Sequence, residues 1–171
     1  EYLKLKAKCV VEKQRRHAVR INHTATHLLH AALKNVLGDH VHQAGSMVAP
    51  DYLRFDLTHH EKIGTDQIDE IETLVNNEIM KNVLLKTEIK KYDVAREEGV
   101  EALFGEKYGD KVRVISVGDF SKELCGGTHV ERSGDIGTFK ITDESSLSTG
   151  VRRMTAVTGK KALHYIQNQN H

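Results

Sequence analysis

The spacing of apolar residues along the chain predicts four helices. Between residues 21 and 36, apolar side chains recur every three or four positions, which is the period of an amphipathic helix. Asn22 is the predicted N-cap of this helix, and Gly38 is predicted to end it. The same analysis predicts further helices over residues 66–80, 93–99 and 159–167.

Alternation of apolar and polar residues predicts a set of strands. The first covers residues 2–10, where small or apolar side chains alternate with lysines, as in a half-buried strand. Further strands are predicted over residues 42–48, 53–57, 85–92, 112–117, 136–142 and 151–157. Because helices and strands are mixed without strict βαβ alternation, the pattern favours an α+β fold of layered sheets and helices.

Length and composition fit one folded domain over residues 1–171. Hydrophobic residues make up 39% of the chain and charged residues 29%, a balance that argues against disorder. The longest apolar stretches are only a few residues, far short of the about 20 that a transmembrane helix needs. Two cysteines and the lack of a secretory leader predict a cytoplasmic protein without a disulfide framework. Because the sequence begins with Glu1 rather than Met, we expect a fragment of a longer protein.

Charge is unevenly distributed, although the net charge is only +1. Residues 1–20 carry a net charge of +5, and the remaining residues carry −4. We expect this basic lead-in of strand and turn to precede a core over residues 21–158 and a terminal helix over residues 159–171. A local basic surface of this kind can contact phosphates, although most such runs are simply hydrated.

Two of the eleven histidines form a motif at helical spacing. His23 and His27 are four residues apart, so they lie on one side of the predicted helix, close enough to bind one metal ion. On a helical wheel both lie almost opposite the apolar face, so the pair is predicted to face either solvent or a cleft formed with another element. His30 lies on the same side and is interpreted as a bystander.

A second motif places a cysteine and a histidine in a glycine-rich turn. Cys125 and His129 are separated by Gly126, Gly127 and Thr128, a spacing that is familiar among zinc ligands. The glycines permit a tight bend and leave room beside an ion. Taken alone, this motif also fits a buried free cysteine next to a histidine at the end of a strand.

The two motifs together predict one zinc site between a helix and a glycine-rich turn. We predict that His23, His27, Cys125 and His129 bind the ion, because a thiolate and imidazoles are the preferred ligands of Zn²⁺. Four protein ligands would make a closed structural site. A catalytic zinc keeps one position open, as it would here if His129 were not a direct ligand.

Signatures of other enzyme classes are absent from the sequence. There is no G-x-S-x-G turn, no phosphate-binding loop, no dinucleotide fingerprint and no H-E-x-x-H helix. No carboxylate is an obvious general base for hydrolysis, and Asp56 and His59 are the candidates that remain.

Longer runs around the two motifs resemble the editing domain of alanyl-tRNA synthetase. The motifs that carry the resemblance cover residues 22–30, 43–46, 54–59, 102–109, 124–130, 150–153 and 156–159, which together span nearly the whole chain. Free-standing trans-editing proteins and threonyl-tRNA synthetase have related domains. The longer runs are more similar to the alanyl enzyme, and Thr128 stands where the threonyl enzyme typically has proline.

The resemblance implies hydrolysis of mischarged seryl-tRNA(Ala) and, less avidly, glycyl-tRNA(Ala), with alanyl-tRNA(Ala) spared. It implies one Zn²⁺ held by the four predicted ligands, so that Cys125 is both a ligand and part of the catalytic site. Thr26 and Gln43 carry over as polar pocket residues, acting in catalysis and in substrate binding. The implied partners are tRNA(Ala) mischarged with serine or glycine and the rest of a parent synthetase chain, with no membrane.

A pocket that recognises the hydroxyl of serine by hydrogen bonding would explain this selectivity. Serine is larger than alanine, so size alone cannot admit serine and exclude alanine. A pocket that hydrogen-bonds the hydroxyl leaves its own polar groups unpaired with alanine, and such sites reach selectivities of about 10⁴. Thr26 offers a hydroxyl, and Gln43 offers both a donor and an acceptor. Arg152 and Arg153 are candidates for binding the phosphates of the substrate.

Three other functions fit the same residues. One is a free-standing trans-editing deacylase. Another is a tRNA-binding module with a structural zinc, which would bind tRNA with a steep salt dependence and without turnover. The third is a zinc-stabilised interaction domain, which would do neither. A net charge of only +1 weighs against strong autonomous RNA binding.

Overall fold

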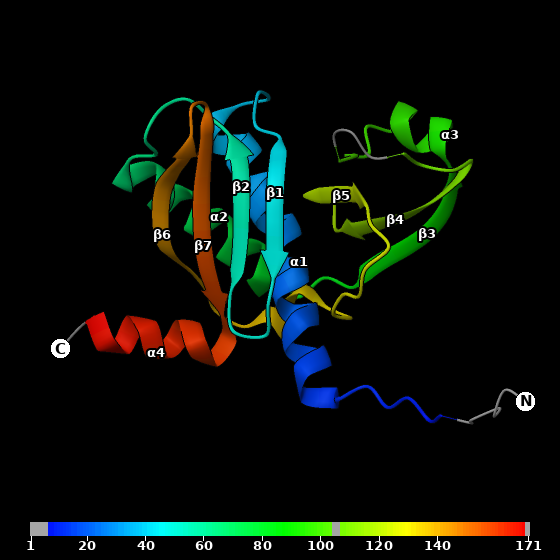
Figure 1. Cartoon of the computed structure of the whole chain (residues 1–171), viewed down its shortest axis with the longest axis horizontal. Helices are drawn as coiled ribbons and strands as arrows, with labels where there is room; N and C mark the ends of the chain where they lie inside the picture. The colour runs from blue at the N-terminus through cyan, green and yellow to red at the C-terminus, as the bar shows by residue number, and fades with distance from the viewer. Residues whose placement is uncertain (1–6, 104–106, 170–171) are drawn as a thin grey trace, which may run out of the picture.

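The computed structural model describes residues 7–103 and 107–169, which form four α-helices and two antiparallel sheets (Figure 1). In chain order the elements are α1 (Lys13–Leu37), β1 (Gln43–Val48), β2 (Leu53–Thr58), α2 (Thr65–Met80), β3 (Leu85–Lys91), α3 (Tyr92–Glu97), β4 (Lys111–Val117), β5 (Ser121–Leu124), the 3₁₀-helix η1 (Ser133–Ile136), β6 (Phe139–Ser148), β7 (Val151–Thr158) and α4 (Gly159–Gln169). The predicted α+β class is confirmed.

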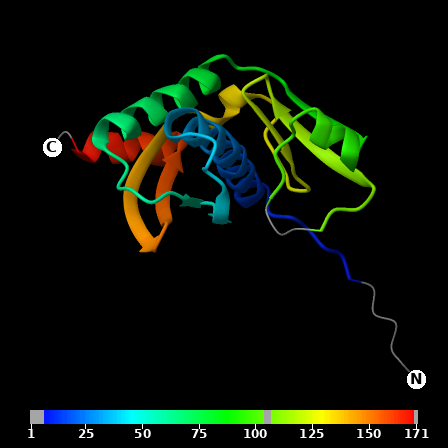
Figure 2. The ribbon, with the colours of Figure 1, turned by 90° about the horizontal axis from the view of Figure 1, so that it is seen from above.

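The larger sheet has the strand order β1-β2-β7-β6, and every neighbouring pair is antiparallel. Helices α1 and α2 lie together against one face of this sheet (Figures 1 and 2). Leu28, Leu29 and Leu33 of α1 are fully buried there, in one core with Phe55 of β2 and Met154 of β7. Each fully buried side chain of this size contributes about 1.5–3 kcal/mol, so this face fixes the orientation of α1.

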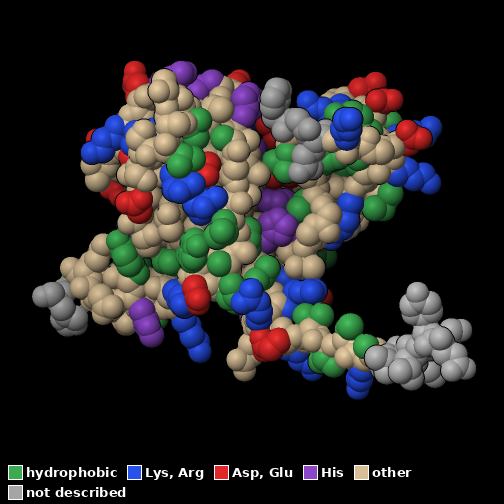
Figure 3. Space-filling model, viewed as in Figure 1, with side chains coloured by type: hydrophobic (Ala, Val, Ile, Leu, Met, Phe, Trp, Pro, Cys, Tyr) green, Lys and Arg blue, Asp and Glu red, His purple; other side chains and the backbone are tan. Residues whose placement is uncertain are grey.

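The smaller sheet has the order β3-β4-β5, and α3 packs against it. It has a core of its own, made by Ala95, Val100, Val112, Val114 and Leu124. Helix α1 lies between the two sheets (Figure 2) and contacts β5 with the face that it turns away from the larger sheet. The polar side of α1 therefore forms one wall of a hollow between the sheets, and Figure 3 shows histidine side chains inside it.

The start of α1 differs from the prediction. The helix begins at Lys13, because the carboxylate of Glu12 accepts hydrogen bonds from the backbone N–H groups of Gln14 and Arg15. Asn22, the predicted N-cap, lies inside the helix, where its side chain donates to the carbonyl of Ala49. The predicted strand over residues 2–10 is wrong at residues 7–10, which form no strand, and residues 2–6 lie outside the described part.

Three further differences concern the second half of the chain. The strand β5 was not predicted, because four residues with two charged side chains carry too little alternation to be recognised. Ile136, the predicted start of a strand, is instead the last residue of the 3₁₀-helix η1, and β6 runs from Phe139 to Ser148. The remaining predicted helices and strands are present, with small shifts at their ends.

Two further expectations concern the motif over residues 102–109 and the absence of a membrane-spanning helix. Part of the motif over residues 102–109 falls at residues 104–106, outside the described residues. Across residues 7–103 and 107–169, no helix combines the length and the apolar character needed to cross a bilayer.

Candidate metal centre

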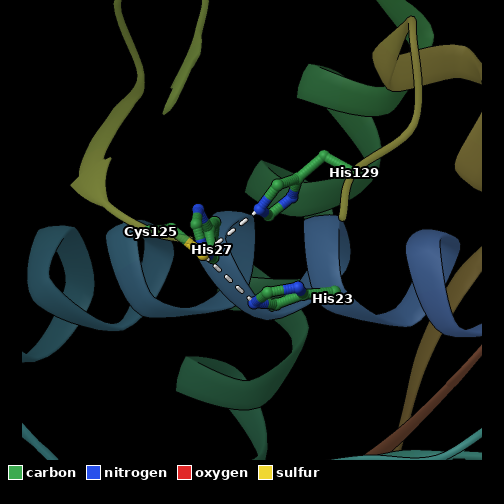
Figure 4. A group of neighbouring side chains, drawn as sticks. All are labelled: His23, His27, Cys125 and His129. Atoms are coloured by element: carbon green, nitrogen blue, oxygen red, sulfur yellow. Dashed lines mark hydrogen bonds between the residues drawn. The ribbon is translucent and has the colours of Figure 1, made fainter. Parts of the chain in front are cut away.

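Two elements bring the four predicted ligands together. Helix α1 supplies His23 and His27, and the turn after β5 supplies Cys125 and His129. One potential ligand atom from each residue lies within 4.8 Å of all the others, although about 100 residues separate the two pairs in the chain. Figure 4 shows the three imidazoles and the thiol converging between the helix and the turn. The histidine pair therefore faces a cleft rather than solvent.

Two distances from the cysteine sulfur fit tetrahedral metal coordination. The sulfur of Cys125 lies 3.5 Å from Nε2 of His23 and 3.3 Å from Nε2 of His129. Metal–ligand bonds of about 2.0–2.3 Å at tetrahedral angles place ligand atoms about 3.3–3.6 Å apart. Nδ1 of His27 is buried and has no hydrogen-bond partner in the described structure. An unpaired buried nitrogen beside a thiol is what a metal ligand requires, so these residues could hold a metal ion.

Only one of the two glycines in the turn is required by its surroundings. A Cβ atom added to Gly127 would overlap the imidazole of His23. A Cβ atom added to Gly126 would have no neighbour within 4 Å. The room beside the site that the sequence predicted is therefore provided by Gly127.

Thr24 sets which nitrogen of His129 faces the sulfur. Its hydroxyl donates to the carbonyl of Arg20 at 3.0 Å, and it accepts from the N–H of Val130. The same oxygen lies 3.1 Å from Nδ1 of His129. Because the hydroxyl proton is already used, we assign a hydrogen to Nδ1, which leaves the lone pair of Nε2 directed at Cys125.

Two arginines fasten the turn by its backbone. Nη1 of Arg113 on β4 donates to the carbonyls of Cys125 and Gly127, at 2.9 and 2.7 Å. Nε of Arg20 on α1 donates to the carbonyl of His129. These contacts hold the turn from both sides of the hollow. Thr24 and Arg113 were missed from the sequence, because neither belongs to a recognisable metal-binding pattern.

The histidines are held neutral, as metal ligands must be. Burial, followed by repulsion from His27, lowers the pKa of His23 to about 4. Burial, followed by repulsion from His27 and His23, lowers the pKa of His129 to about 2. Burial also lowers the pKa of His27. At neutral pH each imidazole therefore has a lone pair available for binding.

His30 is not a bystander, which corrects the prediction. Its side chain is buried, and Nδ1 lies 3.0 Å from Oε1 of Glu123 on β5. The other carboxylate oxygen of Glu123 lies 3.6 Å from Nε2 of His27. Burial acts to raise the pKa of Glu123, but its interactions with His27 and His30 outweigh this effect, and the pKa lies below its usual value. Glu123 was missed because its partners are distant in sequence.

The two predicted pocket residues lie on neighbouring elements. Thr26 is buried next to His27 on α1, and its hydroxyl donates to the carbonyl of Asn22 at 2.8 Å. Gln43 begins β1 and donates to the hydroxyl of Ser46 at 3.2 Å. Together with His30, Gln43 lines a cavity of about 160 Å³. The roles of both residues remain predictions.

The predicted phosphate-binding arginines are both paired with carboxylates on the larger sheet. Nε of Arg152 donates to Glu144 at 2.6 Å. Arg153 makes two hydrogen bonds to Asp56, at 2.8 and 2.9 Å. Binding a phosphate would compete with these pairs, and the role remains a prediction.

The two candidates for a general base both have partners. Asp56 is bound by Arg153, and Nδ1 of His59 lies 2.8 Å from Nε2 of His40.

A family model matches part of the chain that carries this candidate site. Residues 112–155 match the family described as the second additional domain of threonyl and alanyl tRNA synthetases. The matched segment includes Cys125, His129 and Arg113, one of the two arginines that bind the backbone of the turn. The chain is thus similar to an accessory domain of two aminoacyl-tRNA synthetases.

The individual proteins that the chain resembles are alanine–tRNA ligases. It is 58% identical to that of Thermotoga maritima over 159 residues, which cover 93% of this chain and 18% of the ligase. It is 54% identical to that of Fervidobacterium nodosum over 162 residues, 95% of this chain and 19% of the ligase. The ligase of Haemophilus influenzae is 54% identical over 160 residues, 94% of this chain and 18% of the ligase. The resemblance to alanyl-tRNA synthetase is confirmed, and the chain spans 18–19% of the length of these ligases.

Proposed function

We propose that this chain hydrolyses the ester bond of seryl-tRNA(Ala), and less avidly of glycyl-tRNA(Ala), with a bound Zn²⁺. This is the proofreading reaction expected of the editing domain of an alanyl-tRNA synthetase. The observation that carries the proposal is the convergence of His23, His27, Cys125 and His129 within 4.8 Å. The similarity to alanine–tRNA ligases over 93–95% of the chain supports it.

The four residues of the metal centre would hold the ion, and their chemistry suits zinc. One thiolate and three neutral imidazoles match its preferred ligands. When bound, zinc supplies a Lewis acid that can polarise a carbonyl or lower the pKa of a water molecule. Arg113 and Arg20 keep the turn in place through its carbonyls, and Thr24 fixes the orientation of His129.

Selection of serine over alanine is assigned to Thr26 and Gln43. The Thr26 hydroxyl donates to a backbone carbonyl and retains a lone pair to accept from the hydroxyl of serine. The amide of Gln43 lines a cavity of about 160 Å³, the volume of about five water molecules at about 30 Å³ each. That space suits the aminoacyl group of serine or glycine. Arg152 and Arg153 would exchange a carboxylate partner for a phosphate of the tRNA.

The partners of the reaction follow from the same proposal. The substrate is tRNA(Ala) carrying the wrong amino acid, and the site of action is the cytoplasm. The chain spans only 18–19% of its relatives. The rest of a parent synthetase chain is therefore proposed as its covalent neighbour and as the source of most tRNA affinity.

The test is deacylation of seryl-tRNA(Ala) and alanyl-tRNA(Ala), with zinc content measured on the same preparation. We expect serine to be released rapidly and alanine to be spared. Cys125→Ala should lose both zinc and activity, whereas Cys9→Ala, which changes the exposed second cysteine, should keep both. Full activity in Cys125→Ala would overturn the proposal.

A tRNA-binding module with a structural zinc is the second candidate. Four protein ligands around one ion are typical of closed structural sites, which favours this alternative. It predicts that seryl-tRNA(Ala) binds with a steep salt dependence and is not hydrolysed, even at high protein concentration. Turnover of seryl-tRNA(Ala) at any concentration would exclude it.

A further inference from the structure

A buried histidine next to the metal centre has one nitrogen without a partner. His30 lies one helical turn after His27 on α1, and only 3% of it is exposed to solvent. Its Nδ1 lies 3.0 Å from Oε1 of Glu123. Its Nε2 is buried and makes no hydrogen bond to any residue that the structure describes.

The carboxylate determines which nitrogen of His30 carries the hydrogen. A carboxylate oxygen accepts hydrogen bonds, and Oε1 of Glu123 lies 3.0 Å from Nδ1 of His30, so Nδ1 is assigned as the donor. The neutral ring then has its lone pair on Nε2. A carboxylate that orients an imidazole in this way is the arrangement by which hydrolases prepare a histidine to take a proton. The second oxygen of Glu123 faces His27, so both oxygens of the carboxylate are engaged by histidines.

His30 also borders the space assigned to the aminoacyl group. It lines the cavity of about 160 Å³ together with Gln43. It also lines a larger cavity of about 400 Å³ on the hollow between α1 and β5, of which Glu123 is another wall. His30 borders both cavities, and its Nε2, which has almost no exposed surface, lacks the hydrogen-bond donor that a water molecule or a substrate hydroxyl would supply.

We propose that His30 is the general base of the hydrolysis and that Glu123 is its positioning residue. This inference rests on the proposed function and adds the proton acceptor that the sequence did not reveal. The two earlier candidates are less suited, because Asp56 is bound by Arg153 and His59 is paired with His40.

The proposed step balances without an additional reactant. Water attacks the carbonyl carbon of the ester, and one of its protons passes to Nε2 of His30. The tetrahedral intermediate expels the ribose oxygen, which takes the proton back from the imidazolium. The products are the free amino acid and a tRNA with a terminal hydroxyl, and His30 is again neutral with Nδ1 bonded to Glu123.

The test is single-turnover deacylation of seryl-tRNA(Ala) by the 171-residue chain in its zinc-loaded form. His30→Ala and His30→Gln should lower the rate constant at saturation by about 10²–10⁴-fold, which is the usual contribution of a general base. The protein concentration at half-saturation should stay within about threefold, because a base acts on the transition state rather than on binding. His164→Ala, which changes an exposed histidine on α4, is the matched control and should leave both values unchanged.

Imidazole rescue separates a base from a packing residue. Added imidazole should restore part of the activity of His30→Ala, because it can enter the space left by the ring. It should not restore Glu123→Gln, in which the ring is still present but no longer oriented by a carboxylate. Zinc content and the thermal unfolding midpoint, measured on each variant, identify a loss caused by a damaged metal centre or by misfolding.

The outcomes distinguish this inference from the function on which it rests. Wild-type activity with unimpaired His30→Gln and His30→Ala would overturn the base while leaving the editing function standing. A loss in His30→Ala that imidazole cannot reverse, in a folded and zinc-loaded protein, would also overturn it. A wild-type chain that leaves seryl-tRNA(Ala) intact overturns the proposed function and the base together.

Discussion

The candidate metal centre depends on residues other than its four proposed ligands. The hydroxyl of Thr24 donates its hydrogen bond to the carbonyl of Arg20, so Nδ1 of His129 must carry the hydrogen in its contact with Thr24. Gly127 provides the space in which His23 lies. Both act at the scale of single atoms, through one proton and one missing methyl group. A substitution that is small in volume can therefore have a large effect here.

The two glycines of the turn offer a matched pair of substitutions. Gly127→Ala should prevent His23 from reaching the centre, because the new methyl group would overlap its ring. We expect the bound zinc per chain to fall well below one in Gly127→Ala and to stay near one in Gly126→Ala, where the methyl group meets nothing. Elemental analysis after gel filtration measures this, and equal zinc content in the two variants would contradict the assignment.

At the scale of elements, α1 connects the two sheets. Its apolar side packs against the larger sheet, and its polar side carries His23, His27 and His30 towards β5 and the glycine-rich turn. The helix extends well beyond the segment that the apolar pattern indicated, because Glu12 caps it. The added turns carry Arg20, which fastens the carbonyl of His129.

Removing the N-cap of α1 should lower the free energy of unfolding without changing the candidate metal centre. Glu12→Ala leaves the N–H groups of Gln14 and Arg15 without their side-chain acceptor, and loss of a cap costs about 0.5–2 kcal/mol of unfolding free energy. Glu12→Ser keeps an acceptor at the same position and should retain most of the stability. Urea unfolding of the two variants provides the measurement, and equal midpoints would mean that the cap contributes nothing.

At the scale of the whole molecule, the candidate metal centre lies between two parts of the protein that have separate cores. The larger core includes α1, and the smaller one includes Leu124 of β5, directly before Cys125. A bound ion would tie α1 to the turn after β5, in addition to the hydrogen bond between His30 and Glu123. The relative position of the two sheets should therefore depend on the metal.

Chelation should lower the stability of the zinc-loaded chain. A ligand that binds only the folded state stabilises it by about 4 kcal/mol when present at about 1,000 times its dissociation constant. We expect a chelator to lower the thermal unfolding midpoint and added zinc to restore it. Cys125→Ala should be insensitive to both treatments, and an unchanged midpoint in the wild type would argue against a metal that supports the fold.

Local patterns accounted for most of the fold and for the four side chains of the candidate metal centre. The apolar spacing of α2 and the alternation of β2 and β7 were sufficient, because those elements pack with one face on a single core. The same logic failed for β5, whose four residues are too few to show a period. It also failed for the start of α1, where one carboxylate rather than an apolar pattern determines the boundary.

The class of fold, the two candidate metal-binding motifs and the resemblance to alanyl-tRNA synthetase can be predicted from the sequence, because each depends on residues close together along the chain. The support of these motifs by Thr24 and Arg113, and the pairing of His30 with Glu123, become visible in the folded chain alone. The pairing joins residues 93 positions apart. Such a contact depends on how α1 packs between the sheets, and no local period or spacing records it.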